Sequence, residues 1–479
     1  MAANIFHEIL KKDYDKWKDQ EHFFELENGS YRALTLGDFI TRVNRLSAYL
    51  IDNGFKGRNI GVYSPNSIAW ITIDTAVMTY VGMTVGISKD WQSDDLSYAI
   101  GKFDVACLFY SNVLKANVDL IRADHPGVRF ISIEDEFEEI LSSVDVPLFS
   151  IEPKDPDEPA KMVFTSGTTS FPKGCMLSIN NMFASYEGLG KRVPLTPEDS
   201  CYLFLPLNHT YATVFNYLYS FVFGYGVYLC HDIRSMAQEM ALCKPTAFCG
   251  VPIVFERFKD AATKMNVPIK SLLGGRLKYL FSGGAAITPE LRYAFTSEGI
   301  CLMNSYGLSE TASAFAIDYP DNTDLRSSGT IMENLDAKVM DPDEEGYGEL
   351  ALKGPNVFKG YYGDPEATSR AFSPDGYYLT GDIGTIRGNK VYIRGRKDTM
   401  VTLSNGENVA SEKIASKVRE LSPSITSVKV YVRDGRLCCN IFANEKIDID
   451  PLIAELNTRL PKYEKICSYK LIDSRKLMK

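Results

Sequence analysis

The sequence predicts an α/β protein with a large N-terminal domain and a small α+β C-terminal domain. Helix-like and strand-like segments alternate through residues 1–150, short strands broken by glycine follow over residues 327–393, and the last eighty residues form a separate pattern. The length of 479 residues agrees with this division, because one domain usually takes about 100 to 200 residues.

The N-terminal domain is predicted to contain two doubly wound sheet subdomains. Residues 36–53 are periodic in apolar side chains and end before Gly54, which indicates a helix, and residues 59–63 are expected to form a buried strand. Such alternation predicts a largely parallel sheet with helices on both faces. The charged, proline-rich run at residues 152–159 (EPKDPDEP) is typical of a linker, and a second α/β stretch follows to about residue 320.

Two smaller regions follow. The stretch GYGELALKGPNVFKGYYG predicts a small β-rich subdomain, and residues 429–442 predict a hairpin around a type I′ turn at Asp434-Gly435. Residues 450–460 are expected to form a helix. We therefore expect an N-terminal domain at residues 1–397, with subdomains at about 1–155, 156–325 and 326–397, and a C-terminal domain at residues 398–479.

The composition indicates a folded protein with a small ligand. Apolar residues make up 45% and charged residues 24%, which is ordinary for a globular chain, and the net charge of −9 argues against nucleic acid as a partner. Ten cysteines without a Cys-x-x-Cys pair indicate reduced thiols, and five histidines without ligand spacing argue against a metal site built from protein side chains alone. The first residues lack the apolar core of a signal peptide, so we expect a cytoplasmic protein.

Residues 210–230 (TYATVFNYLYSFVFGYGVYLC) carry no charge over 21 positions, a length that would be sufficient to span a membrane. Asn216, five tyrosines and the break at Gly224-Tyr225-Gly226 argue instead for a buried helix followed by an interior strand. We therefore expect no transmembrane span and leave peripheral membrane contact open. The helix either belongs to the core or lines an apolar substrate pocket.

The segment FTSGTTSFPKGCM, residues 164–176, holds five hydroxyl side chains, two glycines and one lysine. Hydroxyl donors, a lysine charge and glycines that allow close backbone approach suit an anion such as a triphosphate. The segment is not a Walker A loop, because Pro172 stands where that motif needs its second glycine. A plain surface loop is the alternative on composition alone.

Four further stretches make this loop part of a specific pattern. They are LPLNHTY (205–211), NSYGLSET (304–311), YLTGD (378–382) and IRGRKD (393–398), the last leading into LSNGEN (403–408). In this order and at these intervals, together with TSGTTSFPKG, they resemble the adenylate-forming superfamily of acyl-CoA synthetases, luciferases and adenylation domains. The resemblance is dense from about residue 160 to residue 412 and is greatest to long-chain fatty acid–CoA ligases.

The resemblance implies an ATP site that uses Mg²⁺. The residues expected to hold the phosphates are Thr165, Ser166, Gly167, Thr168, Thr169 and Lys173, with Ser170 in place of a glycine common in the superfamily. Those expected around the adenosine and the α-phosphate are Gly283, Gly284, Ala285, Ser305, Tyr306, Gly307, Thr311, Asp382 and Arg396. Glu310 is expected to bind Mg²⁺, which prefers oxygen ligands, although Ser309-Glu310-Thr311 by itself fits a helix cap equally well.

The resemblance places His209 beside the acyl carboxylate, so the expected catalytic set is Lys173, His209, Glu310 and Arg396. Without the resemblance, His209 would be an ordinary core residue. Aromatic and aliphatic residues follow His209, KPTAFCGVPIVFERF (residues 244–258) resembles long-chain acyl-CoA synthetases, and no acidic residue for a substrate ammonium lies at residues 207–215. The expected substrate is therefore a medium- or long-chain fatty acid.

The implied reaction forms an acyl-adenylate and then transfers the acyl group to the thiol of coenzyme A. The resemblance also implies a C-terminal domain that is mobile about a hinge at Asp398, and a coenzyme A tunnel lined by Ser404, Gly406 and Glu407. The superfamily has a lysine in a Thr-x-x-Gly-Lys stretch near its end, whereas this sequence stops at Lys479. Either the sequence ends before that stretch or the chain is a divergent member, and we favour the first interpretation.

Two other functions stay open on the sequence. The ligase could load the phosphopantetheine of a carrier protein, or the chain could be a non-catalytic nucleotide-binding homologue. Lys173, Glu310, Asp382 and Arg396 argue against the second alternative, whereas the missing lysine argues for it. The sequence specifies neither the acyl chain length nor the oligomeric state.

Overall fold

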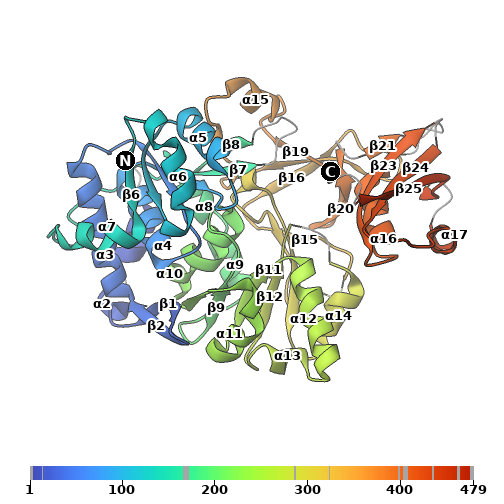
Figure 1. The fold of residues 1–479 in the computed structure, drawn as a ribbon, viewed down its shortest axis with the longest axis horizontal. Helices are drawn as coiled ribbons and strands as arrows, with labels where there is room; N and C mark the ends of the chain where they lie inside the picture. Colours follow the sequence, from blue (N-terminus) through green and yellow to red (C-terminus); the bar gives the residue numbers. More distant parts are fainter. Residues whose placement is uncertain are drawn as a thin grey trace. The chain divides into compact units, whose positions relative to one another are not determined.

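The chain divides into two compact units (Figure 1). Unit 1 comprises Met1–Ala337, Leu352–Tyr378 and Gly388–Val391, and unit 2 comprises Lys338–Ala351, Leu379–Arg387 and Tyr392–Lys479. The predicted α/β class, with a large N-terminal part and a small C-terminal part, is confirmed. The computed structural model describes residues 4–12, 14–165, 172–284, 287–322, 324–397, 400–402, 408–433, 436–460 and 464–474.

The first sheet of unit 1 has seven strands in the described residues. Strands β7, β4, β3, β5 and β6 run parallel, and β8 and β18 run antiparallel to their neighbours. The strand predicted at residues 59–63 is confirmed as β3. The order is β18 (Gly360–Tyr361), β8 (Lys173–Ser178), β7 (Pro159–Thr165), β4 (Met83–Ile87), β3 (Asn59–Tyr63), β5 (Val105–Tyr110) and β6 (Arg129–Ser132).

Helices pack on both faces of this sheet. In β5, Cys107 and Phe109 belong to one hydrophobic cluster, and Leu108 and Tyr110 belong to another. Successive strand side chains point to opposite faces, so a strand that is apolar throughout needs a helix layer on each side. The first cluster includes α3 (Leu36–Asp52), α4 (Ile68–Ala76) and α7 (Ile133–Ser142), and the second includes α5 (Ser93–Lys102) and α6 (Lys115–Ile121). The helix predicted at residues 36–53 is thus confirmed as α3.

The second sheet of unit 1 is also mostly parallel. Strands β13, β12, β11, β9, β10 and β1 are parallel neighbours, although β1 and β2 come from the first 35 residues of the chain. The chain therefore contributes to this sheet before it builds the first one. The order is β15 (Gly329–Ile331), β14 (Ala316–Ile317), β13 (Cys301–Tyr306), β12 (Tyr279–Ser282), β11 (Ala247–Gly250), β9 (Ser200–Leu203), β10 (Gly226–Leu229), β1 (Glu21–Glu27) and β2 (Ser30–Thr35).

The uncharged stretch at residues 210–230 lies in the interior of unit 1. It forms the π-helix η4 (Ala212–Leu218), the helix α10 (Tyr219–Phe223) and, after Gly224 with φ of 78°, strand β10. Every residue of η4 is buried. The predicted buried helix and interior strand are confirmed, and among the described residues no helix is both long and apolar enough to cross a bilayer.

The remaining helices of unit 1 connect or cover these strands (Figure 1). They are α1 (Ile5–Lys12), α2 (Tyr14–Trp17), η1 (Val77–Val81), η2 (Asn112–Leu114), η3 (Arg122–Asp124), α8 (Ile179–Phe183), α9 (Tyr186–Arg192), η5 (Ile233–Ser235), α11 (Met236–Cys243), α12 (Pro252–Met265), α13 (Ile269–Leu272), α14 (Pro289–Thr296), η6 (Ser309–Thr311) and α15 (Pro365–Arg370).

Unit 2 has its own hydrophobic core. Ile414 and Val418 of α16 (Ser411–Arg419) pack in one cluster with Ile441 of β24 and Ile453 of α17 (Asp450–Arg459). Strands β23 (Ile425–Arg433) and β24 (Arg436–Ala443) form the predicted hairpin, whose Asp434-Gly435 turn lies outside the described residues. The predicted helix is confirmed as α17. The other strands are β16 (Asp336–Met340), β17 (Gly348–Lys353), β19 (Tyr378–Arg387) and β20 (Lys390–Arg396) in this order, β21 (Met400–Thr402) paired with β22 (Asn408–Ala410), and β25 (Ser468–Asp473) parallel to β24.

A buried ion pair in unit 1 joins helix α4, strand β7 and the π-helix η4. Lys161 Nζ lies 2.6 Å from Asp74 Oδ2, and both side chains are 0% exposed. The hydroxyl of Tyr217 donates to the same carboxylate oxygen at 2.7 Å. Burial, together with the nearby negative charge of Asp74, raises the pKa of Tyr217 well above its usual value, so the phenol remains a donor.

We expect Lys161→Met to lower the free energy of unfolding by about 3–5 kcal/mol, because it leaves the Asp74 carboxylate buried without its counter-charge. Adding Asp74→Leu should restore part of that loss, since the double variant removes both charges. Urea unfolding followed by circular dichroism measures both effects. Lys115→Met, which breaks the exposed pair with Asp119, is the control and should cost less than about 1 kcal/mol. A double variant less stable than Lys161→Met would contradict this account.

Candidate functional site

The hydroxyl-rich loop connects two paired strands. Thr165 at the end of β7 lies opposite Lys173 at the start of β8 in an antiparallel ladder, so two paired strands flank the hydroxyl-rich segment in the chain. The predicted phosphate-binding residues Ser166, Gly167, Thr168 and Thr169 lie outside the described residues. Thr165 and Lys173 are both half-buried, one on each side of the loop.

Lys173 belongs to a cluster of three side chains from distant parts of the chain. Its Nζ lies 4.9 Å from the centroid of the Tyr361 ring, and the Tyr361 hydroxyl donates to Glu310 Oε1 at 2.8 Å. Tyr361 reaches this place because β18 pairs with β8, where Tyr361 lies opposite Cys175. Burial and then the charge of Glu310 raise the pKa of Tyr361, so its hydroxyl stays protonated and remains a donor.

The Glu310 carboxylate fits a bound Mg²⁺ ion. Its residue is 7% exposed, and in the part of the chain that the structure describes no cationic side chain pairs with it. A buried carboxylate needs a positive partner, and Mg²⁺ is typically held by one or two carboxylates together with phosphate oxygens and waters. The described residues contain no group of three or more metal-ligating side chains, so the other ligands would have to come from phosphates and water.

A second part of the site lies at the carboxyl edge of the parallel strands β12 and β13. Ser282 lies opposite Asn304, so the turn at Gly283-Gly284 and the strand end at Ser305 emerge at the same edge. Ligands of open α/β sheets bind at such edges. Ser305 Oγ lies 3.1 Å from the Tyr211 hydroxyl oxygen and 3.1 Å from the Ser282 carbonyl oxygen.

This edge has room for a ligand. Gly284 has a φ of +77°, and a β-carbon added there would meet nothing nearer than Val251 Cγ1 at 3.8 Å. The buried hydroxyl of Ser282 has no hydrogen-bond partner among the described residues. The open space beside the glycine turn suits the approach of a planar group such as a nucleotide base. Ala285 lies outside the described residues.

The turn after Tyr306 is tightly closed on itself. A β-carbon on Gly307 would lie 1.6 Å from the Ser313 carbonyl oxygen, and the Tyr306 carbonyl accepts from the Phe315 N–H at 2.7 Å. The Thr311 hydroxyl accepts from the Leu308 N–H at 2.9 Å, so Thr311 caps the short helix η6. Ser309–Thr311 is thus a single short turn followed by Ala312 with φ of 48°, not the start of a longer helix, and this turn presents Glu310 to Tyr361.

His209 lies on a segment that is anchored to the first sheet of unit 1. The Asn66 amide donates to the Leu205 carbonyl at 2.8 Å and accepts from the Leu207 N–H at 2.9 Å. Gly86 allows close approach, since a β-carbon there would lie 3.0 Å from Asn208 Cα. The His209 side chain is exposed, yet neighbouring protein atoms remove part of its hydration and lower its pKa.

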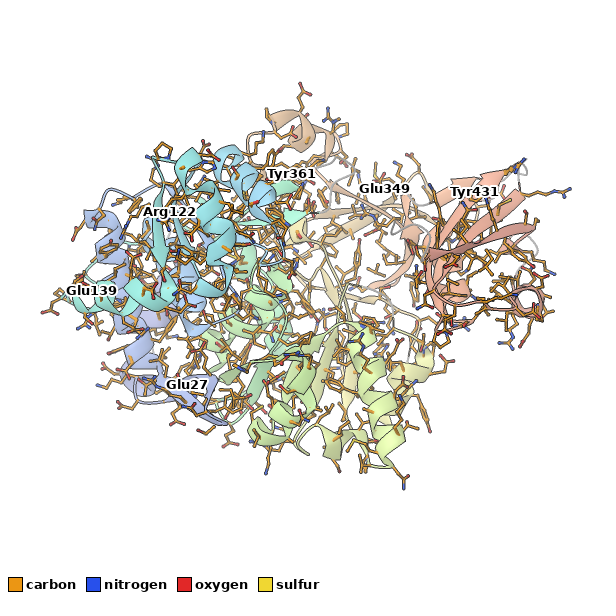
Figure 2. All side chains as sticks on the ribbon, viewed as in Figure 1. Glu27, Arg122, Glu139, Glu349, Tyr361 and Tyr431 are labelled. Carbon is orange, nitrogen blue, oxygen red and sulfur yellow. The ribbon has the colours of Figure 1, made fainter. Side chains whose placement is uncertain are left out.

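The predicted ribose-binding residues lie together in unit 2. Arg396 Nη1 lies 3.1 Å from Asp382 Oδ1 and donates to the Thr380 carbonyl at 2.9 Å. Glu349 Oε1 accepts from the Gly381 N–H at 3.0 Å. Figure 2 labels Glu349 on this unit and Tyr361 on unit 1. The predicted hinge and tunnel residues Asp398, Ser404, Gly406 and Glu407 lie outside the described residues.

The sequence interpretation missed Tyr361 and Tyr211. Tyr361 has no local signature of function, because it lies among other aromatic residues. Tyr211 ends the LPLNHTY motif and is the second residue of the uncharged stretch at residues 210–230, but the motif by itself assigns it no role. Their importance follows from contacts with Glu310 and Ser305, which the strand pairings bring about.

Residues 10–362 match the family of AMP-binding enzymes. Because this match covers well over half of the chain, the protein belongs to that family. The family match includes the loop of residues 166–171, the β12–β13 edge and Tyr361, and it ends before Asp382 and Arg396.

Similar proteins include fatty acyl-CoA synthetases. Fatty acyl-CoA synthetase A of Dictyostelium discoideum is 26% identical over 88% of this chain and 75% of its own length. Long-chain-fatty-acid–CoA ligase 6 of Homo sapiens is 27% identical over 80% of this chain and 65% of its own length. The match thus spans 65% to 75% of the length of these two relatives.

Solved structures share the fold. The anthranilate CoA ligase AuaEII in complex with anthranoyl-AMP superposes with a TM-score of 0.84 at 18% identity, over 98% of this chain and 93% of that one. ATP-bound MatB from Rhodopseudomonas palustris superposes with a TM-score of 0.82 at 22% identity, over 98% of this chain and 95% of that one. At these identities the likeness establishes the fold alone.

We expect Gly307→Ala and Gly284→Ala to differ sharply in stability. At Gly307 the new methyl group would clash with backbone that cannot move aside, which should cost about 3 kcal/mol or more. At Gly284 only the positive φ is unfavourable, at about 1–2 kcal/mol, because the space is open. Thermal unfolding midpoints measure the difference, and equal midpoints would show that the turn after Tyr306 is less rigid than described.

Proposed function

We propose that the protein is an acid–thiol ligase that activates a medium- or long-chain fatty acid with ATP and transfers the acyl group to coenzyme A. The observation that carries the proposal is the cluster of Lys173, Tyr361 and Glu310 at the base of the hydroxyl-rich loop, in a member of the AMP-binding enzymes. A cation and a metal-binding carboxylate at one end of such a loop suit the phosphates of ATP.

In the first step the fatty acid carboxylate attacks the α-phosphate and pyrophosphate leaves. Lys173, with the hydroxyls of Thr165, Ser166, Thr168 and Thr169, would hold the β- and γ-phosphates. Mg²⁺ bound at Glu310 would oppose the negative charge that builds on the phosphates. Tyr361 would keep the Glu310 carboxylate in place, because its hydroxyl fixes one carboxylate oxygen and leaves the other for the metal.

Adenosine would bind at the edge of β12 and β13. The base would lie between the turn at Gly283-Gly284-Ala285 and Tyr306, beside Ser305 and Gly307, with Thr311 near the α-phosphate. On the resemblance alone, we assign the ribose hydroxyls to Asp382 and Arg396, which contact each other in unit 2. These assignments are supported by the resemblance and by the open space at Gly284.

The acyl chain would bind beside the segment that follows His209. This segment is uncharged, and η4 buries Val214, Phe215 and Leu218. An amino-acid substrate would bring an ammonium group into surroundings without a carboxylate partner, which costs several kcal/mol. Because the pKa of His209 is lowered, the imidazole is neutral at neutral pH and could accept a hydrogen bond near the acyl carboxylate.

In the second step the coenzyme A thiol displaces AMP from the acyl-adenylate. We assign the hinge between the two steps to Asp398 and the thiol tunnel to Ser404, Gly406 and Glu407 on the resemblance alone. We place the reaction in the cytoplasm, and we treat 1–397 and 398–479 as the two parts that move, with subdomains as predicted from the sequence.

The acid specificity is tested by ATP–pyrophosphate exchange across a panel of carboxylic acids. Octanoate and palmitate should support exchange at least about tenfold better than leucine and phenylalanine, because a buried unpaired ammonium is costly. A reaction without added acid is the control. If an amino acid outperforms both fatty acids, the substrate assignment is wrong, and the absence of exchange with every acid tested would favour a non-catalytic homologue.

Lys173→Ala and Glu310→Gln should each lower turnover by about 10²–10³, the scale expected when one preorganised charged group is lost at a phosphate site. The Glu310→Gln variant should also need more Mg²⁺ for half-maximal activity. Lys191→Ala and Glu290→Gln, which change exposed residues on α9 and α14, are matched controls and should retain activity. Near-wild-type turnover in either site variant would show that the residue is structural.

A further inference from the structure

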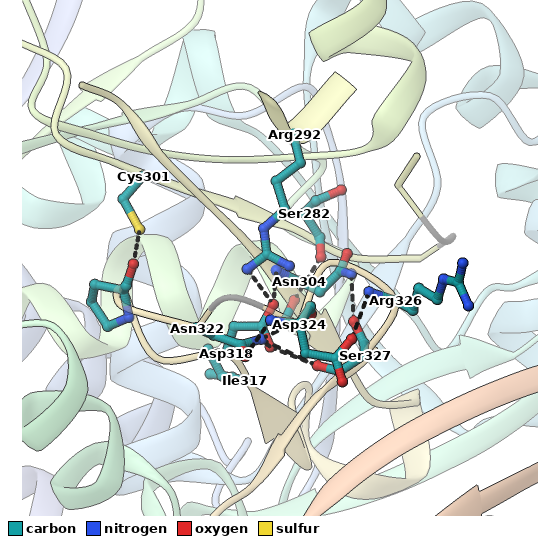
Figure 3. Close-up of polar contacts among 12 residues, drawn as sticks. Ser282, Arg292, Cys301, Asn304, Ile317, Asp318, Asn322, Asp324, Arg326 and Ser327 are labelled. Carbon is teal, nitrogen blue, oxygen red and sulfur yellow. Dashed lines mark hydrogen bonds and ion pairs between the residues drawn. The ribbon is translucent and has the colours of Figure 1, made fainter. Parts of the chain in front are cut away.

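A second buried ion pair of unit 1 lies behind the β12–β13 edge. Arg292 Nη2 lies 2.7 Å from Asp318 Oδ2, and the two side chains are 3% and 0% exposed. Figure 3 shows the two side chains facing each other, with the polar side chains of Asn322 and Ser327 beside the carboxylate. Asp318 Oδ1 accepts from Ser327 Oγ at 2.9 Å and from Asn322 Nδ2 at 2.7 Å.

Asp318 holds the strand that ends at the proposed adenine pocket. Its carboxylate accepts from the Asn304 N–H at 3.2 Å, and its own N–H donates to the Asn304 carbonyl at 3.0 Å. The Asn304 amide donates to the Ser327 carbonyl at 2.8 Å. Asn304 directly precedes Ser305 and Tyr306, so these bonds determine where β13 presents both residues.

Arg292 belongs to the other side of the same pocket. It lies on α14, which begins five residues after Gly284 and is capped by Thr288, whose hydroxyl accepts from the Leu291 N–H. The ion pair therefore connects the element that follows the glycine turn to the strand that carries Ser305 and Tyr306. The pairing of β12 with β13 already joins the two segments that would enclose the base, and the ion pair adds a buried charged contact behind them.

The Arg292–Asp318 ion pair is expected to add little to the free energy of unfolding. Arg292 Nη1 is buried without a hydrogen-bond partner among the described residues, and burial raises the pKa of Asp318 despite the neighbouring guanidinium. A buried ion pair often contributes no more stability than apolar residues of similar size, but its two charged groups must stay in contact to offset their lost hydration. Such a contact suits a place where the spacing of two segments matters.

We infer that Arg292 and Asp318 are positioning residues that fix the distance between the Gly283-Gly284 turn and the Ser305-Tyr306 strand end, and so determine the affinity for the adenine part of the nucleotide. The inference rests on the proposed function in one respect, namely that this edge binds an adenine nucleotide. Neither residue is expected to touch the nucleotide. Their loss should therefore impair nucleotide binding and leave recognition of the fatty acid unchanged.

The test compares Asp318→Asn and Arg292→Met with the wild-type full chain. In pyrophosphate exchange, the KM for ATP should rise about tenfold while the KM for palmitate stays within about twofold, because only the base is misplaced. The Kd for AMP, measured by titration calorimetry, should rise by a similar factor. Lys278→Met, which breaks the ion pair with Asp199 in the same unit, is the control and should change neither KM.

A milder variant covers the case in which Asp318→Asn does not fold. Asn322→Ala removes one hydrogen bond to Asp318 and should raise the KM for ATP about threefold, again without changing the KM for palmitate. Equal increases in both KM values, or folded variants with wild-type Kd for AMP, would overturn the inference while the proposed function stands. Wild-type protein that binds no AMP would overturn both.

Discussion

The ion pair between Asp74 and Lys161 is the contact on which the arrangement of the unit 1 site depends. Lys161 lies on β7, four residues before that strand ends at Thr165, and Tyr217 of η4 donates to the same carboxylate. One buried carboxylate therefore holds both the strand that leads to the proposed phosphate loop and the π-helix that follows His209. Since both charges are fully buried, neither can be satisfied in a displaced position, and the three elements keep one relative placement.

A late segment of the chain completes the phosphate side of the site. Residues 352–378 return to unit 1, where the Asn181 amide donates to the Pro355 carbonyl at 2.7 Å and to the Val357 carbonyl at 2.9 Å. These bonds fix the strand β18 against β8 and place Tyr361 between Lys173 and Glu310. Lys173 and Glu310 thus both contact the neutral Tyr361 side chain and do not form an ion pair with each other. Both charges are therefore available to a ligand.

Among the described residues of unit 1, two ion pairs have both side chains buried, and they share one feature. Each joins segments that carry different parts of the site: Lys161 and Asp74 connect the loop strand with α4, and Arg292 and Asp318 connect α14 with the β13–β14 hairpin. Apolar residues of similar size would stabilise these interfaces equally well, but they would not require two particular groups to stay in contact. The proposed site must hold phosphates and a base at a set distance, so the segments that carry its parts need a fixed spacing.

The sequence alone determined the elements and the chemistry of the site residues. Helix α3, strand β3 and the hairpin β23–β24 were predicted because periodicity and turn residues act over a few positions, and Lys173 and Glu310 were predicted from motifs whose residues are contiguous. Only the tertiary structure decided that β1 and β2 join the second sheet, that Tyr361 stands between Lys173 and Glu310, and that Lys161 is paired with Asp74. The sequence around a single charged residue in an apolar strand does not identify the residue with which it pairs. Strand order and burial bring the two charged residues together from positions far apart in the chain.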